Sequence, residues 1–374
     1  MVTNRPITNN ESGTDCFMKN IVVFGYIGYG NLGDETNLKH LIELLQGMDR
    51  FKITLISAAP DHYAKEYKIN AVGKFDIFGI FQVLSKADLL IGNGGSLFQD
   101  KTSKRSLFYY SALVIIAKLF NTRVFLYGQG IGPIKNRFGK LLTGWVLSMV
   151  DLITVRDRLS IVTLAELNVR KPEIHFTAEP LLGLNKLSGR LVKDYWGQLE
   201  TGNQIKLGFI IQEVSFIKRA FWDQLLDCLR WGTNFETYLI PVQPKDRDFL
   251  QEFALNYGLT ILDTEDSWEQ LQQIVGGLDL LVSTRLHGLV AGVLQGTPCY
   301  GLAADPKVEG FCLQMRVPFT ILNFETEWMG VCNNISNYLI KSPEECMAYR
   351  SKLVFWKARA LENQAILKQY LEKL

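Results

Sequence analysis

The chain has 374 residues, of which 47% are hydrophobic and 21% charged, and its formal net charge is +2. This length predicts two domains of roughly 150–190 residues each, and the composition is that of a globular protein able to bury a large core. The small net charge, without a basic arm, gives no electrostatic argument for nucleic acid binding. The longest apolar runs, 112–117 and 145–150, are far shorter than the roughly 20 residues that cross a bilayer, so we do not expect an integral membrane protein.

The cysteines form no C-x-x-C pair, and none lies near a histidine in the way that would suggest zinc. This pattern is typical of reduced thiols in a cytosolic protein. No secretory signal is visible in the polar residues 1–17, which we predict to be disordered. The six cysteines stand at positions 16, 228, 299, 312, 332 and 346.

The first predicted strand, 21–24, runs into a loop in which glycines 28, 30 and 33 spell G-x-G-x-x-G, ahead of a helix over about 36–45. This spacing is that of a dinucleotide fingerprint. However, the next strand ends without the expected acid, and Asp34 and Glu35 place negative charge where a pyrophosphate would lie, which argues against a nicotinamide cofactor. Asp34 is either a helix-start residue favoured by the helix dipole or a group that faces the hydroxyls or the proton of a ligand.

Two further predicted strands end in glycine-rich loops. The strand over 89–91 leads to Gly92-Asn93-Gly94-Gly95-Ser96, whose backbone N–H groups and hydroxyl suit an anion or a sugar. The strand over 124–127 leads to Gly128-Gln129-Gly130-Ile131-Gly132-Pro133, and Arg156 follows the next strand at the same edge. Three such loops on one side of a sheet predict a ligand crevice there.

The polar segment 181–202 is the predicted linker, and a second α/β unit begins with a strand over 205–211. Its central stretch is a buried strand, 280–282, followed by Ser283-Thr284-Arg285-Leu286-His287-Gly288 at the start of an apolar helix. A strand end that opens into a helix start is a common ligand site, since the first N–H groups of the helix are unpaired. Arg285 can bind phosphate or carboxylate, and His287 can move a proton near neutrality. The alternative is a structural salt bridge and a capping histidine.

Both halves contain Asp-Leu-Leu followed by Ile or Val, at 88–91 and 279–282, which indicates two similar halves. We therefore predict an α/β protein with two Rossmann-like domains that face each other across a cleft. The predicted division is a disordered extension over 1–17, an N-terminal domain over 18–185, a C-terminal domain over 203–342 and amphipathic C-terminal helices over 343–374.

The set of motifs, in this order, resembles the polysaccharide pyruvyl transferase family, in particular its CsaB-like bacterial branch. The resemblance implies a GT-B-like arrangement of the two domains and phosphoenolpyruvate as co-substrate, with no further cofactor. It also implies a pyruvate ketal on a sugar of a cell-surface polysaccharide or its lipid-linked precursor, with release of phosphate. One departure is the loop at Gln212-Glu213, where the family often has a Ser-x-Arg-like element. The motifs that carry the resemblance are 28–35, 94–100, 128–133, 155–157, 284–288 and 305–308.

Carried over by position, the resemblance implies a donor site held by arginine. Phosphoenolpyruvate carries about three negative charges, so two arginines are a reasonable minimum. Ketal formation needs a general acid for the methylene carbon and a base for the sugar hydroxyls, and His287 and Asp34 suit these roles in either order. We expect no metal. The expected catalytic residues are His287, Asp34 and Arg156. The expected substrate-binding residues are Arg285, Gly30, Asn31, Gly94, Gly95, Ser96, Gln129 and Lys307.

Because the acceptor in this family is expected to be lipid-linked, we predict a cytoplasmic protein with peripheral contact to the inner face of the plasma membrane. An apolar and basic patch that includes Arg137, Phe138 and Lys140 is the expected contact. One alternative is a GT-B glycosyltransferase that uses a nucleotide-sugar, since it would also bind phosphate through arginine. The other is a non-catalytic glycan- or nucleotide-binding protein of the same fold, which would predict a degraded site.

Overall fold

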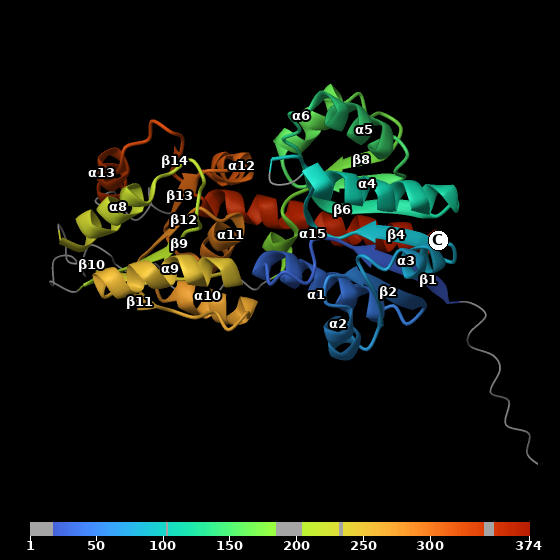
Figure 1. The fold of residues 1–374 in the computed structure, drawn as a ribbon, viewed down its shortest axis with the longest axis horizontal. Helices are drawn as coiled ribbons and strands as arrows, with labels where there is room; N and C mark the ends of the chain where they lie inside the picture. Colours follow the sequence, from blue (N-terminus) through green and yellow to red (C-terminus); the bar gives the residue numbers. More distant parts are fainter. Residues whose placement is uncertain (1–17, 102–103, 185–203, 232–234, 340–347) are drawn as a thin grey trace, which may run out of the picture.

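The computed structural model of the chain describes residues 18–101, 104–184, 204–231, 235–339 and 348–374. Two parallel sheets, each covered by helices, form two lobes that lie side by side (Figure 1). The predicted extension 1–17 and most of the predicted linker lie outside the described residues.

The sheet of the N-terminal lobe has the strand order β3-β2-β1-β4-β6-β7-β8, with β5 paired to β6. Its central strands are almost wholly apolar, because helices cover both faces of a parallel sheet. The strand β5 occupies part of the glycine-rich stretch that the sequence predicts as a turn. The strands are β1 (Lys19–Phe24), β2 (Phe51–Ser57), β3 (Asn70–Gly73), β4 (Leu89–Gly92), β5 (Gly95–Phe98), β6 (Arg123–Ile131), β7 (Leu152–Val155) and β8 (Glu173–Phe176).

The sheet of the C-terminal lobe has the order β11-β10-β9-β12-β13-β14, which matches the first lobe strand for strand from its edge. The repeated Asp-Leu-Leu motif has the same structural role in both lobes. Asp88 accepts a hydrogen bond from the backbone N–H of Asn20 at 2.8 Å, and Asp279 accepts one from the backbone N–H of Lys206 at 2.8 Å. Each aspartate thus joins two central strands at their beginnings. The strands are β9 (Ile205–Ile210), β10 (Phe235–Leu239), β11 (Thr260–Ile261), β12 (Leu280–Ser283), β13 (Cys299–Ala303) and β14 (Phe319–Ile321).

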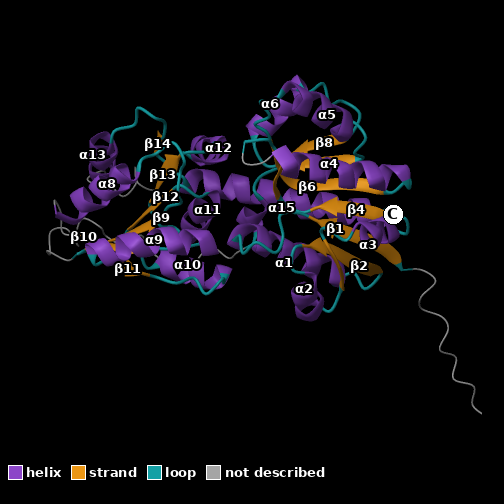
Figure 2. Ribbon diagram, viewed as in Figure 1, coloured by secondary structure: helices purple, strands orange, loops and turns teal. Residues whose placement is uncertain are grey.

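The helices of the N-terminal lobe pack in two layers (Figure 2). The helices α1 (Leu32–Gln46) and α2 (Pro60–Tyr67) cover one face of the sheet, and α3 (Ile77–Leu84), α4 (Lys104–Leu119) and α5 (Arg137–Leu147) cover the other. The remaining helices are α6 (Arg158–Glu166), the 3-10 helix η2 (Pro180–Gly183), α8 (Arg219–Trp231), α9 (Pro244–Tyr257), α10 (Trp268–Gly276), α11 (Leu286–Gln295), α12 (Pro306–Met315), α13 (Trp328–Leu339) and α15 (Arg350–Glu372).

The C-terminal helix α15 joins the two lobes (red in Figure 1). Leu353 belongs to the core of the C-terminal lobe, whereas Leu367 packs into that of the N-terminal lobe. Between them the buried amide of Asn363 accepts a hydrogen bond from the Thr177 hydroxyl at 2.8 Å and donates one to the Ala178 carbonyl at 3.0 Å. In the part of the chain that the structure describes, no helix is both long and apolar enough to span a bilayer.

Two cysteines differ from the sequence-based expectation of reduced thiols. Cys228 on α8 and Cys332 on α13 form a disulfide, although 104 positions separate them in the sequence. The expectation was wrong for this pair because the packing of α8 against α13 brings them together, and no local spacing signals that contact. Cys299 and Cys312 are free and buried.

Candidate active site between the two lobes

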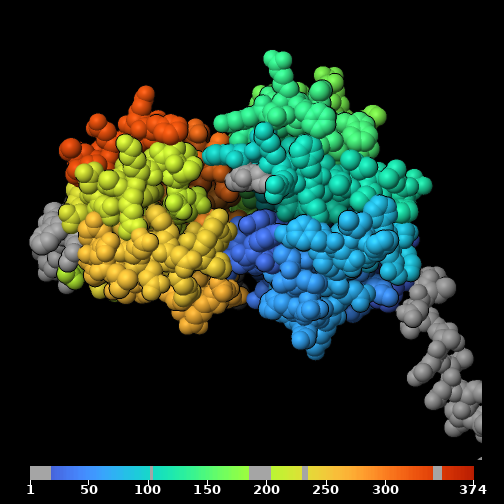
Figure 3. Space-filling view, viewed as in Figure 1, coloured from blue at the N-terminus to red at the C-terminus, as the bar shows by residue number. Residues whose placement is uncertain are grey.

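A cavity of about 240 Å³ lies between the lobes, where the loops after β1 and β4 face the loops after β9, β10, β12 and β13. These are the carboxyl ends of parallel strands, where α/β sheets bind ligands. The lobes meet closely beside the cavity, where the N-terminal lobe in blue touches the C-terminal lobe in gold (Figure 3). There the backbone N–H of Leu32 donates to the Val242 carbonyl at 3.4 Å, and Lys39 pairs with Glu269 at 3.3 Å.

Most of the charged side chains that line the cavity are cationic. Among the described lining residues, the five cationic ones outnumber the acidic Asp34 and Asp305. Burial and the neighbouring arginines lower the pKa of Lys307, and burial followed by the charge of Arg285 lowers the pKa of Lys245. Neighbouring cations destabilise one another's charged form, so a group of them is suited to binding an anion. The five are Lys101, Arg156, Lys245, Arg285 and Lys307.

Asp34 is a buried carboxyl group in the first turn of α1. The helix begins at Leu32, earlier than the sequence predicts, so Asp34 lies inside it, and the N-cap residue Asn31 donates a hydrogen bond to its carboxylate. Gly95 has a φ of +136°, and a Cβ there would lie 3.1 Å from the Asp34 carboxylate. Burial raises the pKa of Asp34 to about 7, although the charges of Lys307 and Arg156 oppose this. The group is therefore divided between its acid and carboxylate forms near neutrality.

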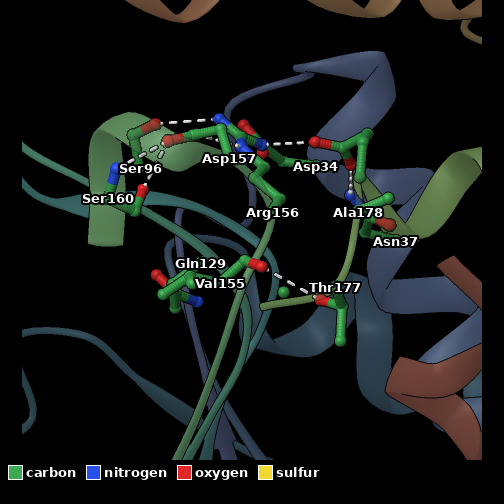
Figure 4. Close-up of polar contacts among 12 residues, drawn as sticks. Asp34, Asn37, Ser96, Gln129, Val155, Arg156, Asp157, Ser160, Thr177 and Ala178 are labelled. Atoms are coloured by element: carbon green, nitrogen blue, oxygen red, sulfur yellow. Dashed lines mark hydrogen bonds and ion pairs between the residues drawn. The ribbon is translucent and has the colours of Figure 1, made fainter. Parts of the chain in front are cut away.

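Arg156 follows β7 and is fixed by two partners. Its guanidinium donates to Glu179 at 2.6 Å and to the Ser96 hydroxyl at 2.9 Å (Figure 4). Glu179 is buried as well and accepts a further hydrogen bond from Asn37 at 3.2 Å. A Cβ on Gly130 would lie 3.0 Å from the guanidinium, so this glycine leaves room for it. Arg156 thus makes a structural salt bridge and also lines the cavity.

Arg285 is the N-cap residue of α11 and donates a hydrogen bond to Asp246 in the first turn of α9. The pair is incompletely satisfied, because neither the Nε of Arg285 nor the second carboxylate oxygen of Asp246 has a hydrogen-bond partner among the described residues. Burial raises the pKa of Asp246 despite the charge of Arg285. The arginine is therefore held at the cavity with donor capacity left over.

His287 lies in the first turn of α11, with its ring directly against Gly33 of the other lobe; a Cβ on Gly33 would overlap the imidazole. Its Nε2 is buried and has no hydrogen-bond partner among the described residues. Burial, and then the charges of Arg156, Lys307 and Arg285, hold its pKa well below the usual range. His287 is therefore a neutral imidazole with one unpaired nitrogen. Unpaired buried polar atoms are rare, and this one calls for an explanation.

Lys307 stands in the first turn of α12, which Asp305 caps by accepting from the Lys307 backbone N–H at 3.0 Å. Within the described ranges, its ammonium group makes no ion pair or side-chain hydrogen bond. Asn31, Gly95 and Ser96, which the sequence analysis expects to bind substrate, also line the cavity.

Three predicted substrate contacts lie outside the cavity lining. Gly30 packs against Pro244 of the C-terminal lobe, and Gly94 packs against the side chain of Asn37. Gln129 is fully buried, and its amide donates to the carbonyls of Gly92, Asn93 and Tyr127 at 3.2, 2.6 and 3.2 Å. Gln129 thus holds the end of β4, because its side chain turns inward from β6, and its contact with substrate stays a prediction.

Several residues of the site were missed in the sequence. Glu179 and Asp246 have no distinctive spacing relative to the arginines they pair with. Asp246 could have been found by applying the strand-end rule to β10, but Glu179 gives no local signal. The Gln212-Glu213 loop also contributes, since Gln212 lines the cavity and its backbone N–H donates to the Thr284 hydroxyl at 3.1 Å. In the described part of the chain, no group of three or more His, Cys, Asp or Glu side chains is placed to hold a metal ion.

Two parallel α/β lobes with a polar cavity between facing strand ends define a GT-B-like protein. Solved structures of similar fold include HepE from Anabaena with UDP and glucose, at 13% identity and a TM-score of 0.61, covering 95% of this chain and 100% of that one. A putative UDP-N-acetylglucosamine 2-epimerase from Listeria monocytogenes has 10% identity and a TM-score of 0.65, covering 96% and 97%. MnaA from S. aureus, solved with UDP, has 11% identity and a TM-score of 0.65, covering 96% and 98%. At these identities the likeness concerns the fold alone.

The family follows from a sequence match over most of the chain. The family model for polysaccharide pyruvyl transferase matches residues 31–306, and the chain belongs to this family of transferases. No curated protein matches the sequence. The CsaB-like branch stays a prediction.

Proposed function

We propose that the protein transfers the pyruvyl group of phosphoenolpyruvate to two hydroxyls of one sugar, in a cell-surface polysaccharide or its lipid-linked precursor. The products are a pyruvate ketal and phosphate. Membership of the polysaccharide pyruvyl transferase family supports the transfer. The donor, the ketal chemistry and the lipid-linked acceptor are our proposal.

The observation that carries the proposal is a cationic cavity that also contains His287 with its unpaired nitrogen and the protonatable Asp34. A donor with about three negative charges would offset the mutual repulsion of the buried cations. We assign the phosphate to the unpaired ammonium of Lys307 and the free capacity of Arg285. Arg156, held by Glu179 and Ser96, would orient the carboxylate of the donor.

We assign the general acid to Asp34 and the general base to His287. The raised pKa of Asp34 supports the first assignment, and a bound anionic donor would raise it further. The lowered pKa of His287 keeps its imidazole neutral and able to accept a proton. A group with a pKa near the working pH is the most effective acid.

In the proposed sequence, Asp34 first protonates the methylene carbon of the donor, which leaves positive charge on the carbon that bears phosphate. One sugar hydroxyl attacks this carbon and gives its proton to His287. The carbon–oxygen bond to phosphate then breaks, and the leaving phosphate takes the proton from His287. The second hydroxyl closes the ketal and returns its proton to Asp34. Both groups end in their starting states, and charge balances.

Donor binding tests the proposal without an acceptor. Titration calorimetry should show binding of phosphoenolpyruvate, and Lys307→Met should weaken it by roughly 10- to 100-fold, since a hydrogen bond to a charged group contributes about 1.5–3 kcal/mol. The matched control is Lys65→Met, because Lys65 is an exposed lysine on α2. Binding of a UDP-sugar instead would favour the glycosyltransferase, and binding of sugar alone would favour the non-catalytic alternative.

A further inference from the structure

One face of the N-terminal lobe is both apolar and free of acidic residues within its helices. This face, formed by α3, α4 and α5, covers one side of the sheet. Six of its large apolar side chains are each more than half exposed to solvent. An apolar surface of this extent is uncommon on a protein that has no partner there. The six are Ile77, Phe78, Leu119, Phe138, Leu141 and Trp145.

Aromatic contacts join α4 to both of its neighbours on this surface, near opposite ends of the helix. Phe81 of α3 meets Phe120, just after α4, edge to face at 6.2 Å between ring centroids. Phe108 near the start of α4 meets Phe138 of α5 at 6.0 Å. The apolar residues of α5 recur at Phe138, Leu141 and Trp145, so they share one side of the helix, while its other side is buried.

The charge of this face differs from that of the whole chain. The helices α3, α4 and α5 contain no aspartate or glutamate, although the chain as a whole has 40 basic and 38 acidic residues. Of the acids next to these helices, Asp76 and Asp100 accept hydrogen bonds from backbone N–H groups, and Asp151 pairs with Lys118 at 2.8 Å. The opposite layer is acidic by comparison, since α1 and α2 contain five acidic residues. The cations on this face are Lys104, Arg105, Arg137 and Lys140, together with Lys118, whose charge the Asp151 carboxylate offsets.

We infer that the α3–α5 face binds the surface of a bilayer that contains anionic phospholipid. Large apolar side chains flanked by Lys and Arg are the combination that inserts at the boundary between headgroups and acyl chains, and an anionic surface attracts the cations. A two-fold dimer through this face would bring like charges together. A nucleic acid would leave the aliphatic Ile77, Leu119 and Leu141 without suitable partners.

The face also reaches the edge of the cavity. Ser106 and Tyr110 of α4 line the cavity, while Phe108 between them points outward to Phe138. A substrate anchored in the same bilayer could therefore approach the cavity from this side. The membrane inference does not depend on the donor or acceptor proposed above, because binding to vesicles is measured without either.

Vesicle flotation tests the inference with the full chain. The protein should float with vesicles of mixed phosphatidylcholine and phosphatidylglycerol, and less with phosphatidylcholine alone or at raised salt. A basic residue near an anionic surface contributes about 1 kcal/mol, or a factor of roughly five, so Arg137→Gln/Lys140→Gln should lower the partition coefficient roughly 25-fold. The matched control is Lys52→Gln/Lys65→Gln, two exposed lysines on β2 and α2.

A second variant tests the apolar contribution. Phe138→Ser/Leu141→Ser/Trp145→Ser should abolish flotation, whereas Leu255→Ser/Leu313→Ser/Val354→Ser, at exposed apolar positions of other helices, should keep it. If the triple serine variant does not fold, Arg137→Gln/Lys140→Gln still tests membrane binding, because it changes only exposed cations. Absence of flotation in the native protein, equal flotation of the glutamine variant and its control, or binding to RNA without binding to vesicles would overturn the inference.

Discussion

Asp34 and His287 line the same cavity, yet burial moves their pKa values in opposite directions. A buried site penalises the charged form, which is the carboxylate for Asp34 and the imidazolium for His287. Both pKa shifts favour the neutral form of the group. Shifted pKa values at a cavity are a common feature of catalytic sites.

The raised pKa of Asp34 gives a stability prediction with a definite sign. Between its ordinary 3.8 and about 7, the native state binds the proton more tightly than the unfolded chain, so stability falls as pH rises through this window. The difference of about 3 pKa units, at about 1.4 kcal/mol each, is on the order of 4 kcal/mol. Asp34→Asn should therefore be more stable than wild type above about pH 7, and the gain should shrink toward acid pH. Urea unfolding across this range measures it, and a gain that does not depend on pH would contradict the account.

Arg156 and Glu179 form a buried ion pair. This pair gives a second prediction. Arg156→Ala should lower the free energy of unfolding by about 3–5 kcal/mol, since it leaves a buried carboxylate without its partner. The double variant Arg156→Ala/Glu179→Ala should lose less than the sum of the two single variants. Denaturant unfolding of the four proteins gives the coupling energy, and additive losses would show that the pair is not coupled.

At this scale the sequence predicted charged residues at strand ends but not their partners. Arg156 follows an apolar strand directly, and Arg285 and His287 stand at the helix start after another, so their position at the carboxyl edge could be inferred. Glu179 and Asp246 reach them only through the folded chain. Gln129 is expected to bind substrate from the family resemblance, and the sequence did not predict that its side chain faces inward to backbone carbonyls.

At the scale of elements, the first turn of α1 sets the distance between the lobes, because Gly33 lies against His287. In an ordinary helix, replacing Gly by Ala gains about 0.5–1 kcal/mol. Gly33→Ala should instead push the His287 ring from its place and lower turnover sharply while the protein stays folded. Gly310→Ala on α12 is the matched control, since nothing lies within 4 Å of the added Cβ, and it should gain stability with unchanged turnover. Equal turnover in the two variants would show that the contact has no functional role.

The order of strands was predictable because each buried strand reads as a short apolar run, and the glycine loops because they follow three of these runs, β1, β4 and β6. The secondary structure within the loops was not predictable. The strand β5 pairs with β6 through residues that resemble a turn, and α1 begins at Leu32 although the apolar period is clear only later. In both places contacts with the rest of the sheet or lobe override the local pattern.

For the whole molecule, α15 connects the lobes at the point where the chain leaves the first sheet. Asn363→Ala would leave the Ala178 carbonyl unpaired, at a cost of about 1–3 kcal/mol. It would also remove one of the two hydrogen bonds of the Thr177 hydroxyl, which also lies 3.1 Å from the Val155 carbonyl. We expect a lower melting temperature and, because Ala178 adjoins Glu179, weaker donor binding. Asn333→Ala on the exposed side of α13 is the control. A melting temperature equal to that of the control would mean that α15 does not fix this segment.

The match between the two sheets was anticipated from the repeated Asp-Leu-Leu motif, because both copies begin a central strand. The crossing of α15 and the disulfide between α8 and α13 were not anticipated. Both depend on contacts between segments far apart in the sequence, and amphipathic periodicity reports the apolar side of a helix but not what it packs against.

The most direct test is transfer itself: release of phosphate from phosphoenolpyruvate in the presence of candidate lipid-linked disaccharides, with the mass of the acceptor followed in parallel. Wild type should release phosphate only with an acceptor present, and the acceptor should gain one pyruvate as a ketal. His287→Gln and Asp34→Asn should each be slower by about 10²–10⁴-fold, with a folded fraction equal to that of wild type. Phosphate release without a change in the acceptor, or near-normal turnover in both variants, would contradict the assignment of this cavity as the site of pyruvyl transfer.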